Sequence, residues 1–221
     1  MDDRELLAVL DAEGRQIGIK TRAQAHADGD WHRLVFVLAA RREANGRSRF
    51  LLQLRSRPGD RYQGQADVLA GGHVGADESH LDCARRECRE ETALDLDVDE
   101  LLYLGCRRLE NPTGVCRRVF QHFYLCLRKL TLTDPSFTDE ASGFLEVDLD
   151  EFDELLADKR STIAAIARTS EVAGAHALRA GRDLVSAYSE ETIESFRRSI
   201  RAVRYVLDTG RSDASLLEDR P

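Results

Sequence analysis

The sequence lacks any apolar run long enough to cross a membrane. Its longest purely apolar stretch is the seven residues 34–40, whereas a transmembrane helix needs about 20. The amino terminus opens with acidic residues, and the apolar stretch 6–10 is too short for the core of a signal peptide. No internal repeat or low-complexity tract is visible. We therefore expect a globular protein without a membrane span, located in the cytoplasm.

Cysteine is sparse and shows no pairing pattern. The chain has five cysteines, an odd number, and no two of them form a CxxC pair. A disulfide framework and a zinc knuckle are therefore not indicated, and small buried side chains are expected. The five residues are Cys83, Cys88, Cys106, Cys116 and Cys126.

Positive charge is in deficit. The 221 residues include 32 Lys or Arg and 40 Asp or Glu, which gives a formal net charge of −8. No basic stripe outweighs the acids, which argues against a binder of nucleic acid polymers. An anionic substrate would need a local source of positive charge.

Up to about residue 157 the pattern of apolar residues predicts more strands than helices. Turn signals such as Asn45-Gly46 separate apolar runs rich in β-forming residues, which is typical of hairpins. The expected strands are 6–11, 16–20, 33–41, 49–55, 67–70, 101–108, 115–127 and 144–147, and the expected helices are 77–94 and 149–157.

The remainder of the chain has a helical composition. We expect helices at 161–168, 173–186 and 190–208, with Ser189 as an N-cap and Gly210 as a stop for the last one. Residues 1–157 are therefore predicted to form one domain. Residues 158–221 are predicted to form a helical extension that packs on this domain or at a dimer interface.

Three carboxylates share one face of the expected helix 77–94. At 100° per residue Glu87, Glu90 and Glu91 fall within one arc of about 100°. Carboxylates about 6 Å apart repel by about 3 kcal/mol at an effective dielectric near 20. A solvated face with salt bridges such as Arg86 to Glu90 is the alternative. A divalent cation would reverse the repulsion, and oxygen ligands suit Mg²⁺ or Mn²⁺ better than zinc.

A pair of glycines, Gly71-Gly72, precedes this helix. Glycine permits close approach of the backbone and can leave a carbonyl free as a further metal ligand. A glycine loop followed by a carboxylate face would bind a metal ion. Such an ion can bind phosphates and polarise a water molecule for attack on phosphorus.

These residues resemble the Nudix box, GX5EX7REUXEEXGU, where U is an apolar residue. The match runs from Gly72 through Glu78 to the segment Arg86-Glu87-Cys88-Arg89-Glu90-Glu91-Thr92-Ala93-Leu94. Every fixed polar position is present, and the one departure is Ala93 where the family usually has glycine. Six matching positions over 23 residues are a far more specific signal than a lone glycine motif.

The resemblance implies an α/β/α sandwich around a mixed sheet, with this helix packed on it. It implies that Glu87, Glu90 and Glu91 bind Mg²⁺, for which Mn²⁺ can substitute. Glu78 and the carbonyl of Gly72 would complete the metal shell, and Arg86 would hold the carboxylates in place.

Members of the family often take a further acid from a later loop. Glu140 is the best candidate here and Asp139 is its rival, and either can be the general base. The alternative is that both are ordinary loop acids.

The similarity extends over roughly residues 5–157. Segments 9–33 and 51–74 resemble the branch that includes isopentenyl diphosphate isomerase and its hydrolase-like relatives. In this chain Gly71 stands where the isomerase has a cysteine, and the glutamate segment that isomerases alter is complete. Residues 62–67 also lack the Pro and Trp of the branch pattern Tyr-Pro-Gly-x-Trp-Asp, so this loop is expected to suit a different substrate.

Several residues outside the box are candidates for substrate binding. His73 follows the glycines and can reach a phosphate, although a packed strand-end histidine is the alternative. Arginines flanking the loop at Pro112 would repel each other across a hairpin unless an anion lies between them, and a solvated basic edge is the alternative. Tyr124 can stack on a base or pack in the core. The candidates are Arg55, His73, Arg117, Arg118 and Tyr124.

The expected function is Mg²⁺-dependent hydrolysis of a diphosphate linkage. The substrate would be a nucleoside diphosphate derivative or a related organic pyrophosphate, with Glu87, Glu90, Arg86 and Glu140 as the catalytic set. A non-catalytic ligand sensor and, less favoured, an isopentenyl diphosphate isomerase are the alternatives. We expect a small-molecule partner, no nucleic acid polymer and no membrane, and a homodimer.

Overall fold

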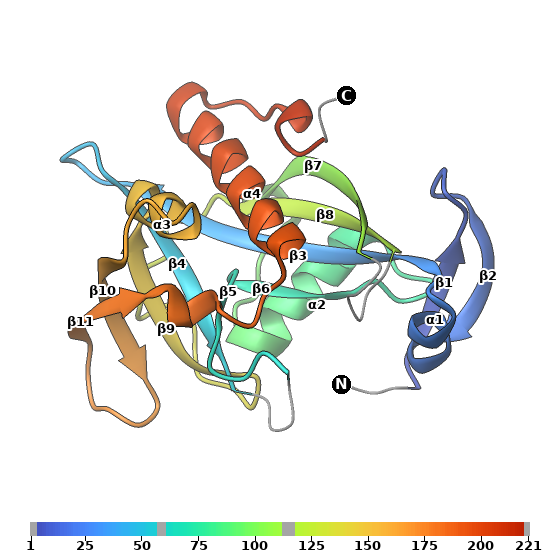
Figure 1. Cartoon of the computed structure of the whole chain (residues 1–221), viewed down its shortest axis with the longest axis horizontal. Helices are drawn as coiled ribbons and strands as arrows, with labels where there is room; N and C mark the ends of the chain where they lie inside the picture. The colour runs from blue at the N-terminus through green and yellow to red at the C-terminus, as the bar shows by residue number, and fades with distance from the viewer. Residues whose placement is uncertain (1–3, 57–60, 112–117, 219–221) are drawn as a thin grey trace.

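The computed structural model describes residues 4–56, 61–111 and 118–218, and one large sheet dominates it (Figure 1). In these residues the sheet has the order β11-β10-β9-β4-β3-β1-β2, while β5 pairs with β4, β6 with β3, and β8 with both β3 and β7. The strands are β1 (Leu6–Leu10), β2 (Gln16–Thr21), β3 (Trp31–Arg42), β4 (Ser48–Arg55), β5 (Ala66–Asp67), β6 (Ala70–His73), β7 (Leu101–Glu110), β8 (Arg118–Cys126), β9 (Ala141–Asp148), β10 (Thr162–Thr169) and β11 (His176–Gly181).

The sheet is mixed. β8 runs parallel to β3 over nine residue pairs, from Trp31 opposite Arg118 to Ala39 opposite Cys126. The other pairings of the described strands are antiparallel.

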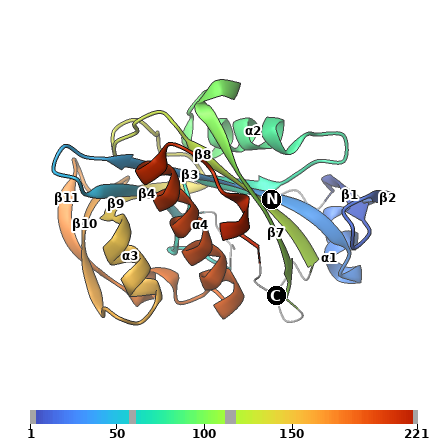
Figure 2. The ribbon, with the colours of Figure 1, turned by 90° about the horizontal axis from the view of Figure 1, so that it is seen from above.

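Helices cover both faces of the sheet. Seen from above, α2 lies on one side and α3 and α4 lie on the other (Figure 2). The expected α/β/α sandwich around a mixed sheet is confirmed. The α-helices are α1 (Arg22–Asp28), α2 (His80–Thr92), α3 (Leu149–Leu156) and α4 (Glu190–Thr209), and the short 3-10 helices are η1 (Val98–Glu100), η2 (Arg182–Val185) and η3 (Ala214–Leu216).

The two layers of core explain the apolar run at 34–40. Side chains alternate between the faces of a strand. Val35 and Val37 therefore pack in the cluster under α2, whereas Leu38 packs in the cluster shared with α3 and α4. A strand that is buried on both faces has apolar residues at successive positions, which gives a continuous apolar run.

Two predicted helices are strands instead. Residues 161–168 and 173–186 were expected to be helical, but the structure has β10 and β11 there, followed by η2. In β10 burial alternates with period two, because Ile163, Ala165 and Ala167 are buried between exposed neighbours. Pairing with β9 on one side and β11 on the other therefore overrides the helical propensity of this alanine-rich segment. The last predicted helix, α4, is present.

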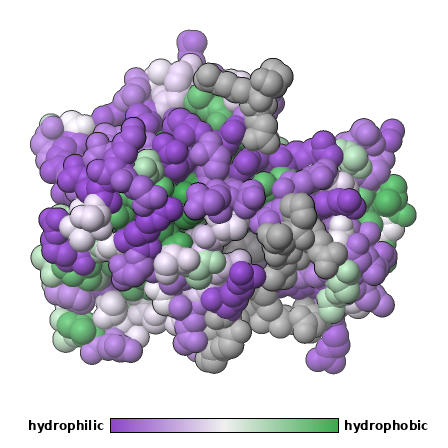
Figure 3. Space-filling model, in the orientation of Figure 1, coloured by the Kyte–Doolittle hydropathy of each residue, from purple (hydrophilic) through white to green (hydrophobic). Residues whose placement is uncertain are grey.

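The part of the chain after residue 157 shares a core with the part before it. Ile163 of β10 and Val203 of α4 belong to the same buried cluster as Leu52 of β4. The face of the molecule in Figure 3 is mostly polar, with apolar residues in small separate patches.

No helix among the described residues is both long and apolar enough to cross a membrane.

Candidate functional site

The site is built where β6 passes against α2. Gly72 lies in β6, and a Cβ atom placed on it would be 2.0 Å from Oε1 of Glu87. A side chain at this position would displace the carboxylate, so only glycine allows the backbone and Glu87 to approach so closely. The glycine of the sequence motif is thus explained by contact with the glutamate fifteen residues later.

The three helix carboxylates differ in burial. Glu87 and Glu91 lie on successive turns of α2 and are only 8% and 4% exposed. Oε2 of Glu91 accepts hydrogen bonds from Nε2 of Gln53 at 2.8 Å and from the backbone N–H of Gly71 at 3.1 Å. Glu90 is exposed, with 55% of its side-chain surface accessible. The structure therefore places two of the three predicted metal ligands inside the protein and one at its surface.

Arg86 connects the carboxylates. Its Nε and Nη2 atoms bind both oxygens of Glu78 at 2.9 and 3.0 Å, in a fork. Nη1 donates to Glu87 at 2.8 Å and to Glu90 at 3.1 Å, while Nη2 also donates to the carbonyl of His73 at 3.1 Å. The fork raises the pKa of Arg86. This planar five-donor group thus fixes the geometry of the acids around it.

Glu78 lies in the turn before α2 and not on the predicted helix, which begins at His80 after the N-cap Ser79. Although burial raises its pKa, the fork with Arg86 and the hydrogen bond from the N–H of Gly75 bring this pKa below the ordinary value. Glu78 is therefore held as a charged partner for Arg86.

The two buried carboxyls carry raised pKa values. Burial, aided by the charges of Glu90 and Glu140 and opposed by Arg86, raises the pKa of Glu87 to about 7. Burial and the charge of Glu87 raise the pKa of Glu91 well above its ordinary value. Buried acids are stable when a cation or a proton neutralises them. Glu87, Glu90 and Glu91 lie on one helix, with Glu87 beside the backbone of Gly72, and therefore offer oxygen donors of the chemical kind that Mg²⁺ or Mn²⁺ prefers.

A loop after β8 brings Glu140 to this cluster. The hydroxyl of Thr138 donates to the carbonyl of Glu91 at 2.9 Å and accepts the N–H groups of Glu140 and Ala141, each at 3.2 Å. Glu140 is half-buried and contributes to the raised pKa of Glu87. Its rival Asp139 is exposed. The structure thus favours Glu140 as the additional acid near the carboxylates.

Arg55 lies near the same cluster but is engaged by an acid. Its Nη1 atom binds Oδ2 of Asp67 at 2.8 Å, and both side chains are mostly buried. The charges of Arg55 and Asp67 both act on Glu91.

The ring of Tyr62 stacks on that of Tyr188, with centroids 4.8 Å apart. Tyr188 belongs to the segment between η2 and α4, so the carboxyl-terminal part of the chain reaches this side of the site.

Sequence reasoning missed Gln53, Asp67, Thr138 and Tyr188. Gln53 had a local signal, since it is a buried amide in an apolar strand and needs a partner. Thr138 and Tyr188 had none, because their partners are remote in the sequence.

Among the described residues, Tyr124 and Arg118 show no contact with the carboxylates. Tyr124 is buried, with its hydroxyl bound to Nδ1 of His80. Arg118 stands opposite Trp31 of β3, whereas Gly72 stands opposite Val35, about 13 Å further along that strand. Arg117 lies outside the described residues.

His73 is buried, and its ring contacts two other histidines. The ring nitrogens of His73 and His26 are 2.9 Å apart, and the ring of His32 stacks on that of His73 at 5.2 Å. Its carbonyl oxygen accepts a hydrogen bond from Nη2 of Arg86.

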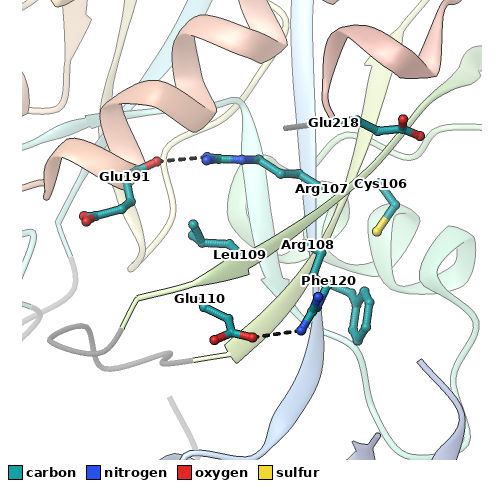
Figure 4. Close-up of a pocket in the computed structure, with 8 residues that line it drawn as sticks. All are labelled: Cys106, Arg107, Arg108, Leu109, Glu110, Phe120, Glu191 and Glu218. Carbon is teal, nitrogen blue, oxygen red and sulfur yellow. Dashed lines mark hydrogen bonds and ion pairs between the residues drawn. The ribbon is translucent and has the colours of Figure 1, made fainter. Parts of the chain in front are cut away.

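The arginines of β7 line a separate cavity of about 630 Å³ beside α4 (Figure 4). Arg107 points to α4, where it donates to the carbonyl of Glu191 and to the hydroxyl of Ser195. Arg108 pairs with Glu110 and lies over the ring of Trp31 at 4.5 Å. These arginines are therefore occupied by contacts within the protein.

The one departure from the motif, Ala93, keeps the backbone that glycine would adopt. Ala93 ends α2 in the left-handed region, with φ 58°, and its N–H donates to the carbonyl of Arg89 at 3.0 Å. This conformation costs an L-residue roughly 1–2 kcal/mol. The helix therefore ends as the motif requires, with some strain.

Comparisons with known proteins agree with this geometry. A family model described as the NUDIX domain matches residues 30–168. An uncharacterised Nudix hydrolase of Clostridium acetobutylicum is 30% identical over 160 residues, which cover 71% of this chain and 76% of that protein. A crystal structure from Deinococcus radiodurans aligns with a TM-score of 0.53 at 20% identity, covering 70% of this chain and 90% of that one. A MutT/nudix family protein from Enterococcus faecalis aligns with a TM-score of 0.50 at 16% identity, covering 84% and 65%.

Proposed function

The chain belongs to the Nudix hydrolase family, and from this premise we propose that it hydrolyses the diphosphate linkage of a small organic diphosphate. The proposed substrate is a nucleoside diphosphate derivative or a related organic pyrophosphate, and the proposed cofactor is Mg²⁺, with Mn²⁺ as a substitute. The main support is the pair of buried carboxyls, Glu87 and Glu91, packed against the glycine backbone with raised pKa values.

The residues divide into ligands and supports. Glu87, Glu90 and Glu91 would hold the metal, and when bound it supplies positive charge to the diphosphate and lowers the pKa of a water molecule. Arg86 keeps the carboxylates in their relative positions through the fork with Glu78. Gln53 orients Glu91 by donating to Oε2. The supports are therefore positioning residues, whose loss would change turnover through the carboxylates.

One acid must accept the proton of the attacking water. Glu90 is exposed and already on the metal-binding face, and Glu140 is brought beside Glu87 by Thr138. Glu140→Gln with Asp139→Asn as the matched control tests the second candidate, because the two acids are adjacent but only Glu140 is half-buried. We expect the Gln variant to lose turnover and the Asn variant to keep it.

The function is tested by measuring phosphate release from a panel of diphosphates with Mg²⁺. We expect turnover that a chelator abolishes and that Glu91→Gln reduces on the order of 100-fold or more, as for other preorganised electrostatic groups. Circular dichroism would show that the variant is folded. Wild-type turnover by a folded Glu91→Gln protein would contradict the proposal, and the absence of turnover with every substrate would favour a ligand sensor.

A further inference from the structure

Three histidines from separate elements meet beside the carboxylate site. His26 is in α1, His32 in β3 and His73 in β6, and a ring nitrogen from each lies within 4.8 Å of the other two. His32 and His73 are buried, and His26 is half-buried. None of these rings has a role in the proposed diphosphate chemistry.

The protonation of His32 is fixed by its neighbour. Its Nδ1 atom lies 2.9 Å from the carbonyl oxygen of Asp30. A carbonyl only accepts, so Nδ1 carries the hydrogen, and in the neutral ring Nε2 is left with a lone pair. Histidines that bind metals commonly donate their other ring N–H to a backbone carbonyl in this way.

The lone pair on Nε2 of His32 is buried and accepts no hydrogen bond from the described residues. Nε2 of His32 has no hydrogen-bond partner among the described residues, and the whole residue is only 1% exposed. Buried polar atoms almost always have a partner, and one that lacks it calls for an explanation such as an ion. The neighbouring pair, Nε2 of His26 and Nε2 of His73, is 2.9 Å apart.

A single metal ion would satisfy the cluster. Zinc binds imidazole nitrogen at about 2.0–2.1 Å in tetrahedral geometry, which places two ligand nitrogens about 3.3 Å apart. The observed distances between the ring nitrogens, from 2.9 Å to at most 4.8 Å, lie on both sides of this value. Ring movements that shift the nitrogens by about an ångström would therefore complete the site. Imidazole ligands select zinc, copper, nickel or iron over Mg²⁺, which prefers oxygen.

We propose that His26, His32 and His73 bind one transition-metal ion of the Zn²⁺ class, at a site separate from the carboxylates. The ion would tie α1 to strands β3 and β6. Because the carbonyl of His73 accepts from Arg86, it would also steady the residue that holds the carboxylates.

The charges around the cluster are mixed. Arg22 is buried nearby and opposes a cation, and Glu5 lies 3.7 Å from it and partly offsets its charge. A neutral three-histidine set therefore suits an ion that binds nitrogen strongly, and not one held by charge alone.

The test measures metal binding without any diphosphate. The full chain is stripped with a chelator and titrated with Zn²⁺ and with Co²⁺, whose visible absorption reports tetrahedral nitrogen ligands. A Glu87→Gln/Glu91→Gln protein removes the carboxylate site from the measurement. We expect this protein to retain one tightly bound Zn²⁺ or Co²⁺ per chain and to melt at a higher temperature with Zn²⁺ than without it.

Histidine variants in that background locate the ion. His32→Gln should weaken binding by more than the roughly 10- to 100-fold that losing an outer partner costs. His26→Gln, at a half-buried helix position, gives the same test with less risk to folding. His80→Gln is the matched control, because His80 also stacks on a histidine, His122, at 4.2 Å but lies outside the cluster. It should bind Zn²⁺ as its parent does.

Two results would overturn the proposal. One is a stripped protein without the carboxylate ligands that takes up no Zn²⁺ or Co²⁺. The other is undiminished binding by folded His26→Gln and His32→Gln proteins. In either case the histidines form a hydrogen-bonded cluster only. Because no substrate is used, these results are independent of whether the chain hydrolyses diphosphates.

Discussion

Glu87 should make the metal-free protein less stable as the pH rises. Its carboxyl keeps its proton up to a pKa of about 7 in the folded protein, against an ordinary value of 4.5. Between these two pH values the folded state binds more protons than the unfolded state, so the free energy of unfolding falls as the pH increases. Glu87→Gln carries no charge at any pH and keeps the acceptor for Arg86. The variant should therefore escape this loss.

The size of the effect follows from the pKa difference. A rise from 4.5 to about 7, at about 1.4 kcal/mol for each unit, corresponds to about 3 kcal/mol. Without metal, Glu87→Gln should match the wild type near pH 4.5 and exceed its stability by about 3 kcal/mol near pH 8. For a chain of this size that difference is about 6–12 °C in melting temperature.

The assay is thermal or urea unfolding of both proteins in chelator between pH 5 and pH 8. The two proteins are compared at each pH because other groups also titrate. Burial lowers the pKa values of His32 and His73, which makes stability rise with pH toward 6.5 in both proteins. The control is Glu90→Gln, an exposed carboxyl on the same helix, which should change stability by less than about 1 kcal/mol.

A second series with Mg²⁺ completes the experiment. The wild type should regain stability near pH 8 because the cation replaces the missing proton, whereas the variant should gain much less. If the difference between wild type and Glu87→Gln is the same at pH 5 and pH 8, burial does not raise the pKa of Glu87, and the reasoning fails.

Three further substitutions, each paired with a control, probe the surroundings of α2. Gly72→Ala should abolish hydrolysis, because its Cβ would be 2.0 Å from a carboxylate oxygen, whereas Gly75→Ala meets only ordinary contacts and should stay active in the same assay. Ala93→Gly should raise the free energy of unfolding by about 1 kcal/mol in urea, since it removes left-handed strain, and Gly210→Ala at the end of α4 should lower it by a similar amount. Thr138→Val should lower the free energy of unfolding by about 1–3 kcal/mol and reduce turnover, because it removes the hydroxyl that binds Glu91 and Glu140. Thr138→Ser keeps the hydroxyl and should retain wild-type stability and turnover.

Most strands before residue 157 and the helix α2 could be predicted because their signals are local, whereas the mixed sheet was expected from the family resemblance. The apolar run at 34–40 lies in β3, and the turn at Asn45-Gly46 follows it closely in the sequence. This turn joins β3 to β4, and the two strands pair as neighbours. The strand at 162–169 could not be predicted in the same way. Its small residues are compatible with a helix, and only the edge of β9, reached through the fold, selects the extended form.

In the candidate site, too, contacts between residues close in the sequence could be predicted, and contacts between distant residues could not. The carboxylate face of α2 was predicted because Glu87 and Glu91 are one helical turn apart, so their spacing alone brings them together. The residues that orient this face come from other strands and loops. Gln53 is 38 residues from Glu91, and Thr138 is 47 residues from it, so only the fold reveals these contacts.

The number of donors around the carboxylates supports the proposal of an added positive charge at this site. Arg86 donates to Glu78, Glu87 and Glu90 at once, so one positive charge serves three acids. Glu91 receives its hydrogen bonds from an amide and a backbone N–H, which are neutral. Neutral donors orient a buried carboxylate but cannot cancel its charge, so burial still raises the pKa of Glu91 well above its ordinary value. Protons can meet this deficit near pH 5. At neutral pH the proposed divalent cation would meet it, and that cation would also attract a negatively charged substrate to a protein with a net charge of −8.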